Sequence, residues 1–387
     1  MQIYDAIIVG GGPAGSSAAY DMADAGLNVL LIDRRTFPRF KACGGALTIK
    51  TLNRFRFSIA PVIKTAVSSK VVGFGMLSQS LIKGDHPILV TTVREELDQY
   101  CFEQALEKGA KFQQISEILE IDEKSDMVTL KIEGQEELQC RYLIGADGAR
   151  SRVRKISGEF SPDTSALALE GIVPLAKCKS IPELTFDYGV VKNGYGWLFP
   201  KDNHINVGIY TRKPEEDEIN KSRLRKYVQK RLGTDEIEKI TGFPIGTGGE
   251  HYEPKSARIF LVGDAAGFAE CIWGEGIHNA VHSGQLAAKA IISALNDGEN
   301  ANHLYRDAIK DMKRDLFNSR RLADVFYRWL PVSYISLQFK RVRQAILNSF
   351  ASGYTVTETK HALFERHPEF NICKPLSLIE FESFHQK

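Results

Sequence analysis

Short, mostly apolar runs open this chain. Residues 4–9 (YDAIIV) and 27–32 (LNVLLI) are rich in aliphatic side chains, and residues 13–25 between them are small and compatible with a helix. Short apolar runs of this kind are typical of strands buried on both faces, as in a parallel sheet. The pattern predicts a strand, a helix and a second parallel strand at the start of the chain.

Further apolar and alternating runs predict a second sheet. The four clearest runs cover residues 70–77, 183–190, 195–199 and 204–210. Strands of this kind are typical of a separate antiparallel sheet, and the Lys-, Arg- and Glu-rich residues 215–232 are expected to form a helix on its surface. Because these strands lie outside the first unit, they are assigned to a different part of the fold.

A glycine motif joins the first predicted strand to the helix. Gly10 permits a tight turn, Gly12 lets the backbone approach a pyrophosphate, and Gly15 lets helix and strand pack closely. The first turn of the helix presents free N–H groups to phosphates. Asp33 ends the second predicted strand, where its carboxylate can bind a ribose diol. The predicted contacts with the AMP half of a dinucleotide are Gly10, Gly12, Pro13, Ala14, Gly15, Asp33 and Arg34.

A second glycine-rich segment indicates that the dinucleotide is FAD. Residues 258–267 (RIFLVGDAAG) form an apolar strand ending in an acid, and a glycine-rich turn and a helix follow. The acid can bind the ribityl chain of a flavin, and the turn can approach the pyrophosphate and the isoalloxazine. A simple NAD-binding domain has no use for this second element. The predicted contacts are Gly263, Asp264, Gly274, Gly276 and Ile277.

Two more segments fit an FAD-binding fold. Arg94 lies where a strand gives way to a helix, and Asp147 and Gly148 follow another apolar strand. Each has a simpler interpretation, a solvated helix residue for Arg94 and a plain turn for the other two. Taken together in chain order, the four elements resemble the para-hydroxybenzoate hydroxylase-like FAD superfamily. The resemblance implies that Arg94, Asp147 and Gly148 contact FAD.

Two shorter motifs narrow the resemblance. One is Lys41-x-Cys43-Gly44-Gly45, after the second strand, and the other is YGWLFPK over residues 195–201. Both are similar to motifs of the geranylgeranyl reductase family, in which KxCGG lies near the flavin and YxWxFPK lies over the substrate cavity. The resemblance implies an FAD-dependent reductase that saturates carbon–carbon double bonds of a polyprenyl chain, with Cys43, Gly44 and Gly45 beside FAD.

The aromatic motif also has an interpretation of its own. Tyr195, Trp197 and Phe199 stand at alternate positions, so their rings share one face of a strand. Such a face, with Pro200 at its end, suits an apolar and flexible substrate chain. The alternative is a core strand whose rings fill the interior between two sheets. The presence of the KxCGG motif favours the substrate interpretation.

The expected chemistry requires a hydride and a proton. An isolated trisubstituted alkene is a poor hydride acceptor, so hydride transfer from N5 of reduced FAD must be coupled to protonation of the other carbon. The π faces of Tyr195 and Trp197 can stabilise the cation-like centre by about 1–2 kcal/mol. Our hypothesis is that Cys43 tunes flavin reduction or proton delivery, and the alternative is a buried thiol that only packs. These three are the predicted catalytic residues.

Length and composition fit a large globular enzyme. With 387 residues, 43% of them hydrophobic and 25% charged, the chain can bury a sizeable core. The predicted fold is an α/β Rossmann-like FAD-binding domain with an inserted antiparallel-sheet substrate domain and a helical C-terminal segment. The boundaries are 1–65, 91–160 and 255–300 for the FAD-binding domain, 66–90 and 161–254 for the substrate-binding domain, and 301–387 for the C-terminal segment.

Charge and cysteine usage exclude several classes of function. The net charge of +2, with no nucleic-acid-binding signature, argues against nucleic acid as a partner. Six cysteines without CxxC spacing indicate reduced thiols and no zinc site, and no other metal site is predicted. The N-terminus enters a strand at once and no apolar run reaches about 18 residues, which predicts a cytoplasmic protein. We expect a monomer.

The C-terminal segment has two open interpretations. Residues 313–343 carry eight Lys or Arg against two acids, interleaved with large apolar side chains. Basic residues among apolar ones suit a surface that contacts anionic lipid headgroups, which implies peripheral attachment to the cytoplasmic membrane. The alternative is a helical cap whose apolar stripe closes the substrate cavity.

The electron donor and the reaction class also have alternatives. No second GxGxxG marks a nicotinamide domain, so we expect electrons from transiently bound NAD(P)H or from a reduced protein carrier. The alternative function is an FAD-dependent monooxygenase or halogenase on an apolar or aromatic substrate. The Trp-x-Trp-x-Ile-Pro motif of halogenases is not matched, because Tyr195 and Phe199 replace its first Trp and its Ile. A non-catalytic flavoprotein or lipid-binding module is the third possibility.

Overall fold

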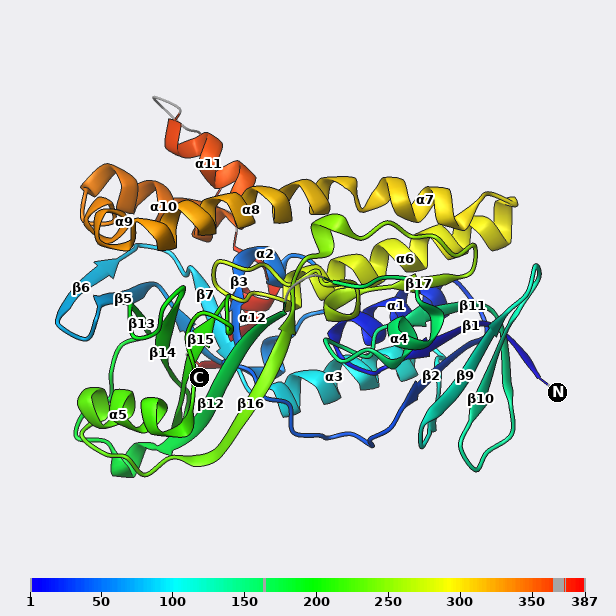
Figure 1. Ribbon diagram of the computed structural model, residues 1–387, viewed down its shortest axis with the longest axis horizontal. Helices are drawn as coiled ribbons and strands as arrows, with labels where there is room; N and C mark the ends of the chain where they lie inside the picture. Colours follow the sequence, from blue (N-terminus) through cyan, green and yellow to red (C-terminus); the bar gives the residue numbers. More distant parts are fainter. Residues whose placement is uncertain (1, 163–164, 365–371, 373, 386–387) are drawn as a thin grey trace.

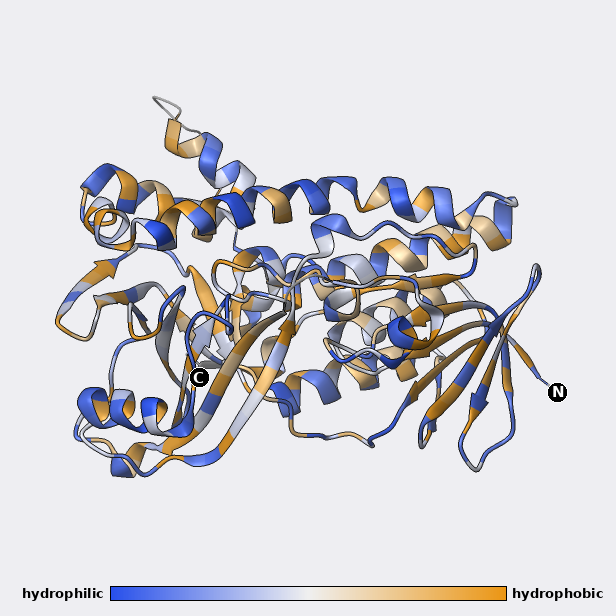
Figure 2. Cartoon of the chain, in the orientation of Figure 1, coloured by the Kyte–Doolittle hydropathy of each residue, from blue (hydrophilic) through white to orange (hydrophobic). Residues whose placement is uncertain are grey.

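The computed structural model describes residues 2–162, 165–364, 372 and 374–385. Figure 1 shows one large sheet towards each end of the molecule, with long helices running along the same side of both. In Figure 2 the strands of both sheets are largely hydrophobic, whereas the long helices alternate hydrophobic and hydrophilic positions. This is the mixed α/β architecture that the apolar patterns predict.

The first sheet contains the predicted β-α-β unit. Strand β1 (Ile3–Val9) leads into helix α1 (Pro13–Asp24), and strand β2 (Val29–Asp33) pairs with β1 in parallel. The strand order is β8-β2-β1-β11-β10-β9, with β17 paired to β11. The other strands are β8 (Lys111–Gln114), β9 (Ile118–Glu123), β10 (Val128–Ile132), β11 (Leu138–Gly145) and β17 (Ile259–Leu261).

The second sheet has the strand order β16-β12-β15-β14-β13-β5-β6. Its strands are β5 (Ser69–Phe74), β6 (Ser78–Lys83), β12 (Ser165–Pro174), β13 (Thr185–Tyr188), β14 (Gly194–Pro200), β15 (His204–Thr211) and β16 (Glu238–Gly246). The prediction of a wholly antiparallel sheet is wrong at one pair, because β5 and β13 run parallel. These two strands are far apart in the chain, so no hairpin turn imposes an antiparallel direction on them.

A small third sheet lies between the other two. It has the order β3-β7-β4, formed by β3 (Ala46–Thr48), β7 (Leu89–Thr92) and β4 (Ile63–Val67). The predicted substrate-domain residues 66–90 therefore contribute to two sheets, since β5 and β6 belong to the second one. Strand β7 leads directly into helix α3 (Arg94–Glu107), as the sequence predicts.

The helix predicted over residues 215–232 is shorter than expected. Helix α5 spans Lys221–Leu232. The Asn220 side chain caps it by accepting a hydrogen bond from the N–H of Arg223 at 2.9 Å. Asp217 lies in the preceding loop and pairs with the Arg223 guanidinium. A side-chain cap and a folded acidic loop therefore replace the first predicted turn.

The remaining helices cover the sheets. Helices α2 (Ile49–Leu52), α4 (Arg152–Ser157) and α6 (Ile277–Asp297) precede the C-terminal series α7 (Ala301–Ala308), α8 (Lys310–Arg328), α9 (Leu330–Ser336), α10 (Lys340–Ser352), α11 (Val356–Phe364) and α12 (Leu376–His385). Figure 1 shows α7 and α8 running along the edge of both large sheets. Among the described residues, no helix is long and apolar enough to cross a bilayer.

Candidate active site

Helices α1 and α6 both begin without a side-chain cap for their first N–H groups. Helix α1 follows Gly12 and helix α6 follows Gly276, and neither residue can supply a capping side chain. The two helices pack closely, because a Cβ on Gly284 of α6 would lie 2.2 Å from the Ala14 carbonyl oxygen of α1. Free N–H groups and the positive ends of both helix dipoles are therefore available to an anionic group.

The glycine loop of α1 has one crowded position and one open position. A Cβ on Gly15 would lie 1.8 Å from the Gly10 carbonyl oxygen, so only glycine allows α1 to pack against the end of β1. At Gly12, by contrast, such a Cβ would meet only Arg39 Nη2, at 3.4 Å, among the described residues that are not its chain neighbours. The chain therefore leaves space next to Gly12, at the start of the uncapped helix.

Asp33 lies beside this loop at the end of β2. Its Oδ2 accepts a hydrogen bond from the Gly11 N–H at 2.9 Å, and its Oδ1 accepts one from the Arg35 N–H at 2.9 Å. The neighbouring Arg39 guanidinium lies 4.0 Å from Asp33 and 3.4 Å from Asp98. Arg34 itself is exposed. Sequence reasoning missed Arg39, which lies between the glycine loop and the start of α3.

The interpretation of Arg94 as a solvated helix residue is wrong. Its side chain is 9% exposed and forms two hydrogen bonds to Asp98, at 2.7 and 2.9 Å. Burial by itself lowers the pKa of the Arg94 guanidinium, but contacts with Asp98 and Cys43 outweigh burial and raise it. Arg94 is therefore a permanent buried cation beside the KxCGG loop.

Asp147 has a structural role in addition to its predicted one. Its carboxylate accepts hydrogen bonds from the N–H groups of Arg152 and Val153, at 2.6 and 3.1 Å, and from the Ser151 hydroxyl. It therefore holds the start of α4. Gly148 next to it has a φ of +79° and no heavy atom within 4 Å of a Cβ built on it. The chain thus leaves open space at Gly148.

Asp264 and Lys41 form the other side of the candidate cofactor site. Burial raises the pKa of the Asp264 carboxyl above its ordinary value. Its Oδ1 would lie 3.1 Å from a Cβ on Gly276, so the acid is next to the start of α6. Burial lowers the pKa of the Lys41 ammonium to about 8, and the Lys41 Nζ lies 3.4 Å from the centre of the Phe243 ring.

The two short motifs meet in the structure, although more than 150 residues separate them. The Lys201 ammonium of the YGWLFPK segment donates hydrogen bonds to the carbonyl oxygens of Gly44 and Gly45, at 2.9 and 3.2 Å. A Cβ on Gly44 would lie 2.9 Å from the Phe199 ring and 3.3 Å from Trp197 Nε1. The KxCGG loop therefore lies directly against strand β14.

The predicted shared face of Tyr195, Trp197 and Phe199 is confirmed. Their ring centroids are spaced at 6.1 and 6.2 Å along one side of β14. On the other side, Gly196 faces Tyr227 of α5. Pro200 ends the strand and is half-buried.

The aromatic rings contact a loop and a helix, and their core cluster also includes Leu89 of the third sheet. The hydroxyls of Tyr195, Tyr210 and Tyr327 donate hydrogen bonds to the carbonyl oxygens of residues 273, 271 and 272, at 2.5, 2.7 and 2.7 Å. Three tyrosines therefore hold the loop between the Asp264 strand and α6. The same burial fits the alternative of a core strand whose rings pack between two sheets, so both interpretations stand.

A buried acid that sequence reasoning missed lies behind Cys43. Glu170 on β12 is 5% exposed, accepts a hydrogen bond from the Cys43 N–H and contacts Asn206 Nδ2 at 3.4 Å. Asn206 in turn accepts a hydrogen bond from Trp197 Nε1 at 2.7 Å. Burial raises the pKa of the Glu170 carboxyl to about 7. An acid inside the apolar run SALALEGIVP is the signal that could have identified it.

Burial also lowers the pKa of the Lys201 ammonium towards neutral pH. Its side chain is 6% exposed, and burial lowers the pKa of Lys201 to about 7. The charges of Glu170 and Lys201 each favour the charged form of the other. Two groups with pKa values near 7 therefore contact the KxCGG loop, Glu170 at the Cys43 N–H and Lys201 at the Gly44 and Gly45 carbonyl oxygens, an arrangement suited to proton transfer.

The position of Trp197 depends on Gly208, and this gives a testable prediction. A Cβ on Gly208 would lie 2.1 Å from the Trp197 indole, so Gly208→Ala should displace the ring. We expect kcat/KM to fall by about tenfold or more because the rings lose their alignment, while the flavin absorbance is retained. The matched control is Gly242→Ala in the same sheet, where the nearest atom is Leu169 Cδ1 at 3.5 Å. Equal activity of both variants would show that Trp197 need not be held there.

Comparisons with known proteins agree with this geometry. A family model described as an FAD binding domain matches residues 3–308. A geranylgeranyl diphosphate reductase of Synechocystis is 32% identical, over 76% of this chain and 76% of that protein. A menaquinone reductase of Mycobacterium tuberculosis is 30% identical, over 85% of this chain and 86% of that protein. The chain belongs to the geranylgeranyl reductase family of FAD-dependent oxidoreductases.

Other matches extend this result. An uncharacterised protein of Methanosarcina barkeri is 36% identical, over 86% of this chain and 86% of that protein. The crystal structure of a geranylgeranyl bacteriochlorophyll reductase-like protein of Thermoplasma acidophilum has a TM-score of 0.78 at 23% identity, covering 99% of both chains. A halogenase in complex with FAD has a TM-score of 0.68 at 16% identity, covering 94% of this chain and 83% of that one. At these identities the solved structures show the fold alone.

FAD is therefore the cofactor of this geranylgeranyl reductase family member, and the glycine loop fits it. The open space at Gly12, the uncapped starts of α1 and α6 and the carboxylate of Asp33 match the needs of a diphosphate and a ribose. Among the described residues, no group of three or more His, Cys, Asp or Glu is arranged to hold a metal ion.

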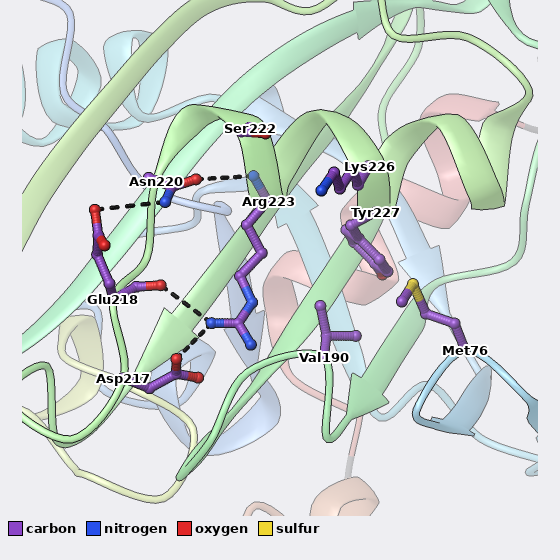
Figure 3. Close-up of a pocket in the computed structure, with 9 residues that line it drawn as sticks. All are labelled: Met76, Val190, Asp217, Glu218, Asn220, Ser222, Arg223, Lys226 and Tyr227. Atoms are coloured by element: carbon purple, nitrogen blue, oxygen red, sulfur yellow. Dashed lines mark hydrogen bonds and ion pairs between the residues drawn. The ribbon is translucent and has the colours of Figure 1, made fainter.

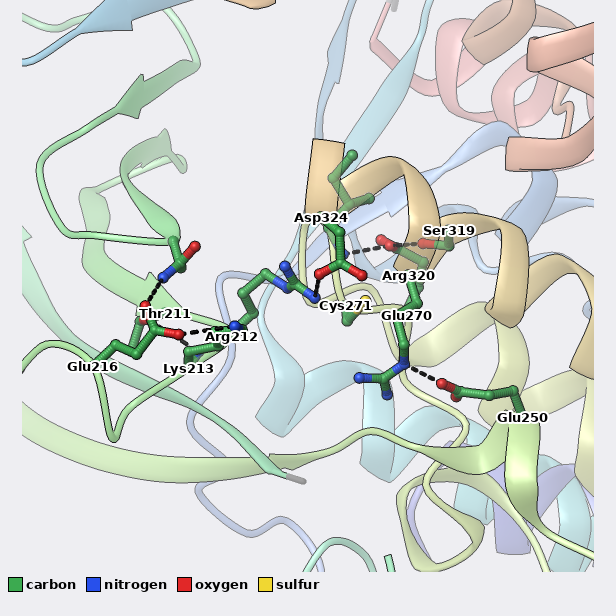
Figure 4. Close-up of polar contacts among 12 residues, drawn as sticks. Thr211, Arg212, Lys213, Glu216, Glu250, Glu270, Cys271, Ser319, Arg320 and Asp324 are labelled. Carbon is green, nitrogen blue, oxygen red and sulfur yellow. Dashed lines mark hydrogen bonds and ion pairs between the residues drawn. The ribbon is translucent and has the colours of Figure 1, made fainter. Parts of the chain in front are cut away.

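A separate polar network fixes the loop that the tyrosines hold. Glu270 is 2% exposed and accepts hydrogen bonds from the Ser319 hydroxyl of α8 and from the N–H groups of Ile272 and Trp273. Figure 4 shows the contact between Glu270 and Ser319, together with the ion pairs Arg212–Asp324 and Arg320–Glu250. Helix α8 is therefore tied to the second sheet and to the loop that precedes α6.

A cavity next to helix α5 lies away from this site. It has a volume of about 580 Å³ and is lined by residues of α5 and its preceding loop, together with Met76 and Val190. Figure 3 shows Arg223 across it, paired with Asp217. None of the predicted site residues lines this cavity, so it is not the place of the flavin chemistry.

Proposed function

We propose that this FAD-dependent reductase saturates isolated carbon–carbon double bonds in a polyprenyl chain. The observation that carries the proposal is the contact between the KxCGG loop and the aromatic face of β14, through Lys201 and Gly44. Relatives named geranylgeranyl diphosphate reductase and menaquinone reductase, at about 30% identity, support a substrate with a polyprenyl chain. Reduced FAD supplies the hydride when it is bound.

The aromatic face is proposed to bind the substrate chain. Tyr195, Trp197 and Phe199 are each 5% exposed, so they offer an apolar and dry environment to an alkene. Because their ring faces carry negative potential, Tyr195 and Trp197 are proposed to stabilise the cation-like carbon that develops as the proton is added. The residues proposed to contact FAD are those predicted from the sequence, with Arg39 added.

Glu170 is proposed to supply the proton. Its carboxyl has a pKa of about 7, so at neutral pH a substantial fraction of it carries a proton. It accepts a hydrogen bond from the Cys43 backbone and is linked to Trp197 through Asn206. Lys201, with a pKa also near 7, is proposed to return a proton to Glu170 after each turnover. Cys43 then positions Glu170 through its N–H, and its thiol lines the site.

The test of the proposed function is an anaerobic reaction followed by product mass. Dithionite-reduced holoenzyme is incubated with geranylgeranyl diphosphate or with menaquinone, so that either electron donor, NAD(P)H or a protein carrier, is bypassed. Because dithionite alone reduces the menaquinone ring to the quinol, that product is reoxidised to the quinone before its mass is measured. We expect a product heavier by two hydrogens for each bond reduced, with at least one of these substrates. A product that forms only with oxygen and gains one oxygen atom would instead identify a monooxygenase.

A further inference from the structure

Helices α8, α9 and α10 expose a cluster of large apolar side chains. We call this cluster the apolar corner. Its five members are 57–63% exposed and lie within 15 residues of one another: Val325, Trp329, Val332, Ile335 and Phe339. Single exposed apolar residues are ordinary, but a cluster of large ones marks an interaction surface.

A β-hairpin extends the same surface. The Ser78 hydroxyl contacts the Tyr334 hydroxyl at 3.1 Å, and the Ser80 hydroxyl donates to the Gln338 side chain at 2.6 Å, so the β5–β6 hairpin is attached to α9. Leu77 at the tip of this hairpin is 83% exposed. In Figure 1, β6, α9 and the adjoining ends of α8 and α10 lie together at one end of the molecule.

The chain segment that carries the apolar corner is positively charged. Residues 325–352 contain four basic residues and no Asp or Glu, whereas the whole chain has a net charge of only +2. The four are Arg328, Lys340, Arg341 and Arg343. The acid that precedes this stretch, Asp324, is paired with Arg212. Apolar side chains surrounded by cations suit an interface of lipid tails and anionic headgroups.

The inner side of the same helical turn reaches the candidate active site. Phe326 lies between Val325 and Tyr327, and its ring packs edge-on against Tyr188 at 5.0 Å. The Tyr188 ring is 6.0 Å from the ring of Tyr195, and Tyr327 holds the loop before α6. One turn of α8 therefore contacts solvent on one side and the aromatic cluster on the other.

We propose that the apolar corner docks on the surface of an anionic lipid bilayer. The inference deepens the proposed function and rests on it, because a polyprenyl substrate is itself dissolved in lipid. A second copy of the chain is a poorer occupant, since a symmetric contact through this surface would bring the basic residues of both copies together. The bilayer supplies both the apolar phase and the negative charge that the surface lacks.

Vesicle flotation tests the docking without any catalytic readout. Holoenzyme is floated with vesicles of phosphatidylcholine containing phosphatidylglycerol, and with pure phosphatidylcholine vesicles. We expect binding to the anionic vesicles that weakens with added salt. The variant Val332→Glu/Ile335→Glu should bind the anionic vesicles at least about tenfold more weakly than the wild type, because each side chain loses its burial in the lipid. The matched control is Leu119→Glu/Ile181→Glu, at positions 45% and 64% exposed on other elements.

Two results would overturn the docking proposal. One is equal flotation of the corner variant and the control variant; the other is a wild-type protein that never floats. A dimer that the corner variant abolishes, with no vesicle binding, would assign the surface to a second copy. Turnover of detergent-dispersed geranylgeranyl diphosphate separates this from the proposed function. If the protein still reduces the dispersed substrate but does not float, only the docking proposal is wrong. If the protein floats but forms no reduced product, only the proposed function is wrong.

Discussion

Replacing Glu170 with Gln is expected to lower the rate of alkene reduction by about 100-fold or more. The amide keeps the size of the side chain and can still accept a hydrogen bond from the Cys43 N–H, but it cannot donate an acidic proton to a carbon. Flavin content should remain unchanged, since Glu170 lies on β12 and is not among the residues proposed to contact FAD. Single-turnover oxidation of the reduced flavin by substrate measures the effect.

The pH dependence of the same reaction provides the second readout. The Glu170 carboxyl is protonated, and able to donate, below its pKa of about 7, so the single-turnover rate should fall as the pH rises through about 7. The Glu170→Gln variant should lack this fall. Glu183→Gln, which alters an exposed acid just before β13 of the same sheet, is the control. If Glu170→Gln leaves both the rate and the pH profile unaltered, the proton comes from another group.

Substitutions at two glycines of the α1 loop should separate folding from cofactor binding. Gly15→Ala places a Cβ 1.8 Å from the Gly10 carbonyl oxygen, and we expect it to lower the free energy of unfolding by about 3 kcal/mol or more. Gly12→Ala meets only the far end of Arg39, so the apoprotein should keep its stability. Its methyl group instead fills the space at the helix start, and FAD affinity should fall by about tenfold or more.

Thermal unfolding of the apoproteins and titration with FAD measure the two effects. The pattern is informative because the two variants each add one methyl group, three residues apart. The account predicts a lower melting temperature for Gly15→Ala and a normal one for Gly12→Ala, which nonetheless binds FAD poorly. Normal FAD binding by a stable Gly12→Ala protein would contradict the assignment of the pyrophosphate to the N-terminus of α1.

Local sequence patterns were sufficient for the β-α-β unit and for the aromatic face. Strand β1, helix α1 and strand β2 depend on residues close together in the chain, and their glycines report the tight packing directly. The alternation of Tyr195, Trp197 and Phe199 likewise needs only the two-residue period of a strand. Such features are read from neighbours in the sequence.

Long-range contacts were out of reach of the same reasoning. The parallel pairing of β5 with β13, and the hydrogen bond from the Cys43 N–H to Glu170, join segments more than 100 residues apart. The local sequence of each segment gives no indication of the distant segment that it contacts. The burial that brings the pKa values of Glu170 and Lys201 close to 7 is produced only when the two sheets and the KxCGG loop come together.

The caps and loops show a third limit. Asp147 is predicted from the sequence to contact FAD, and its carboxylate also holds the start of α4, a role that the motif does not show. The loop of residues 271–273 carries no pattern of its own, because three tyrosine hydroxyls from distant elements and Glu270 determine its position. Side chains that bind backbone groups are chosen by tertiary structure, so a motif alone does not reveal them.

The mass of the product formed under anaerobic conditions tests the central claim most directly. Reduced holoenzyme is mixed with geranylgeranyl diphosphate and with menaquinone, and the product masses are measured after a single turnover and after many. The ring of the menaquinone product is first reoxidised to the quinone, so that only hydrogens added to the polyprenyl chain are counted. The account predicts a gain of two hydrogens per reduced bond, without oxygen, and a greatly reduced yield with Glu170→Gln. An unchanged substrate mass in both reactions, with the flavin still reduced, would contradict it.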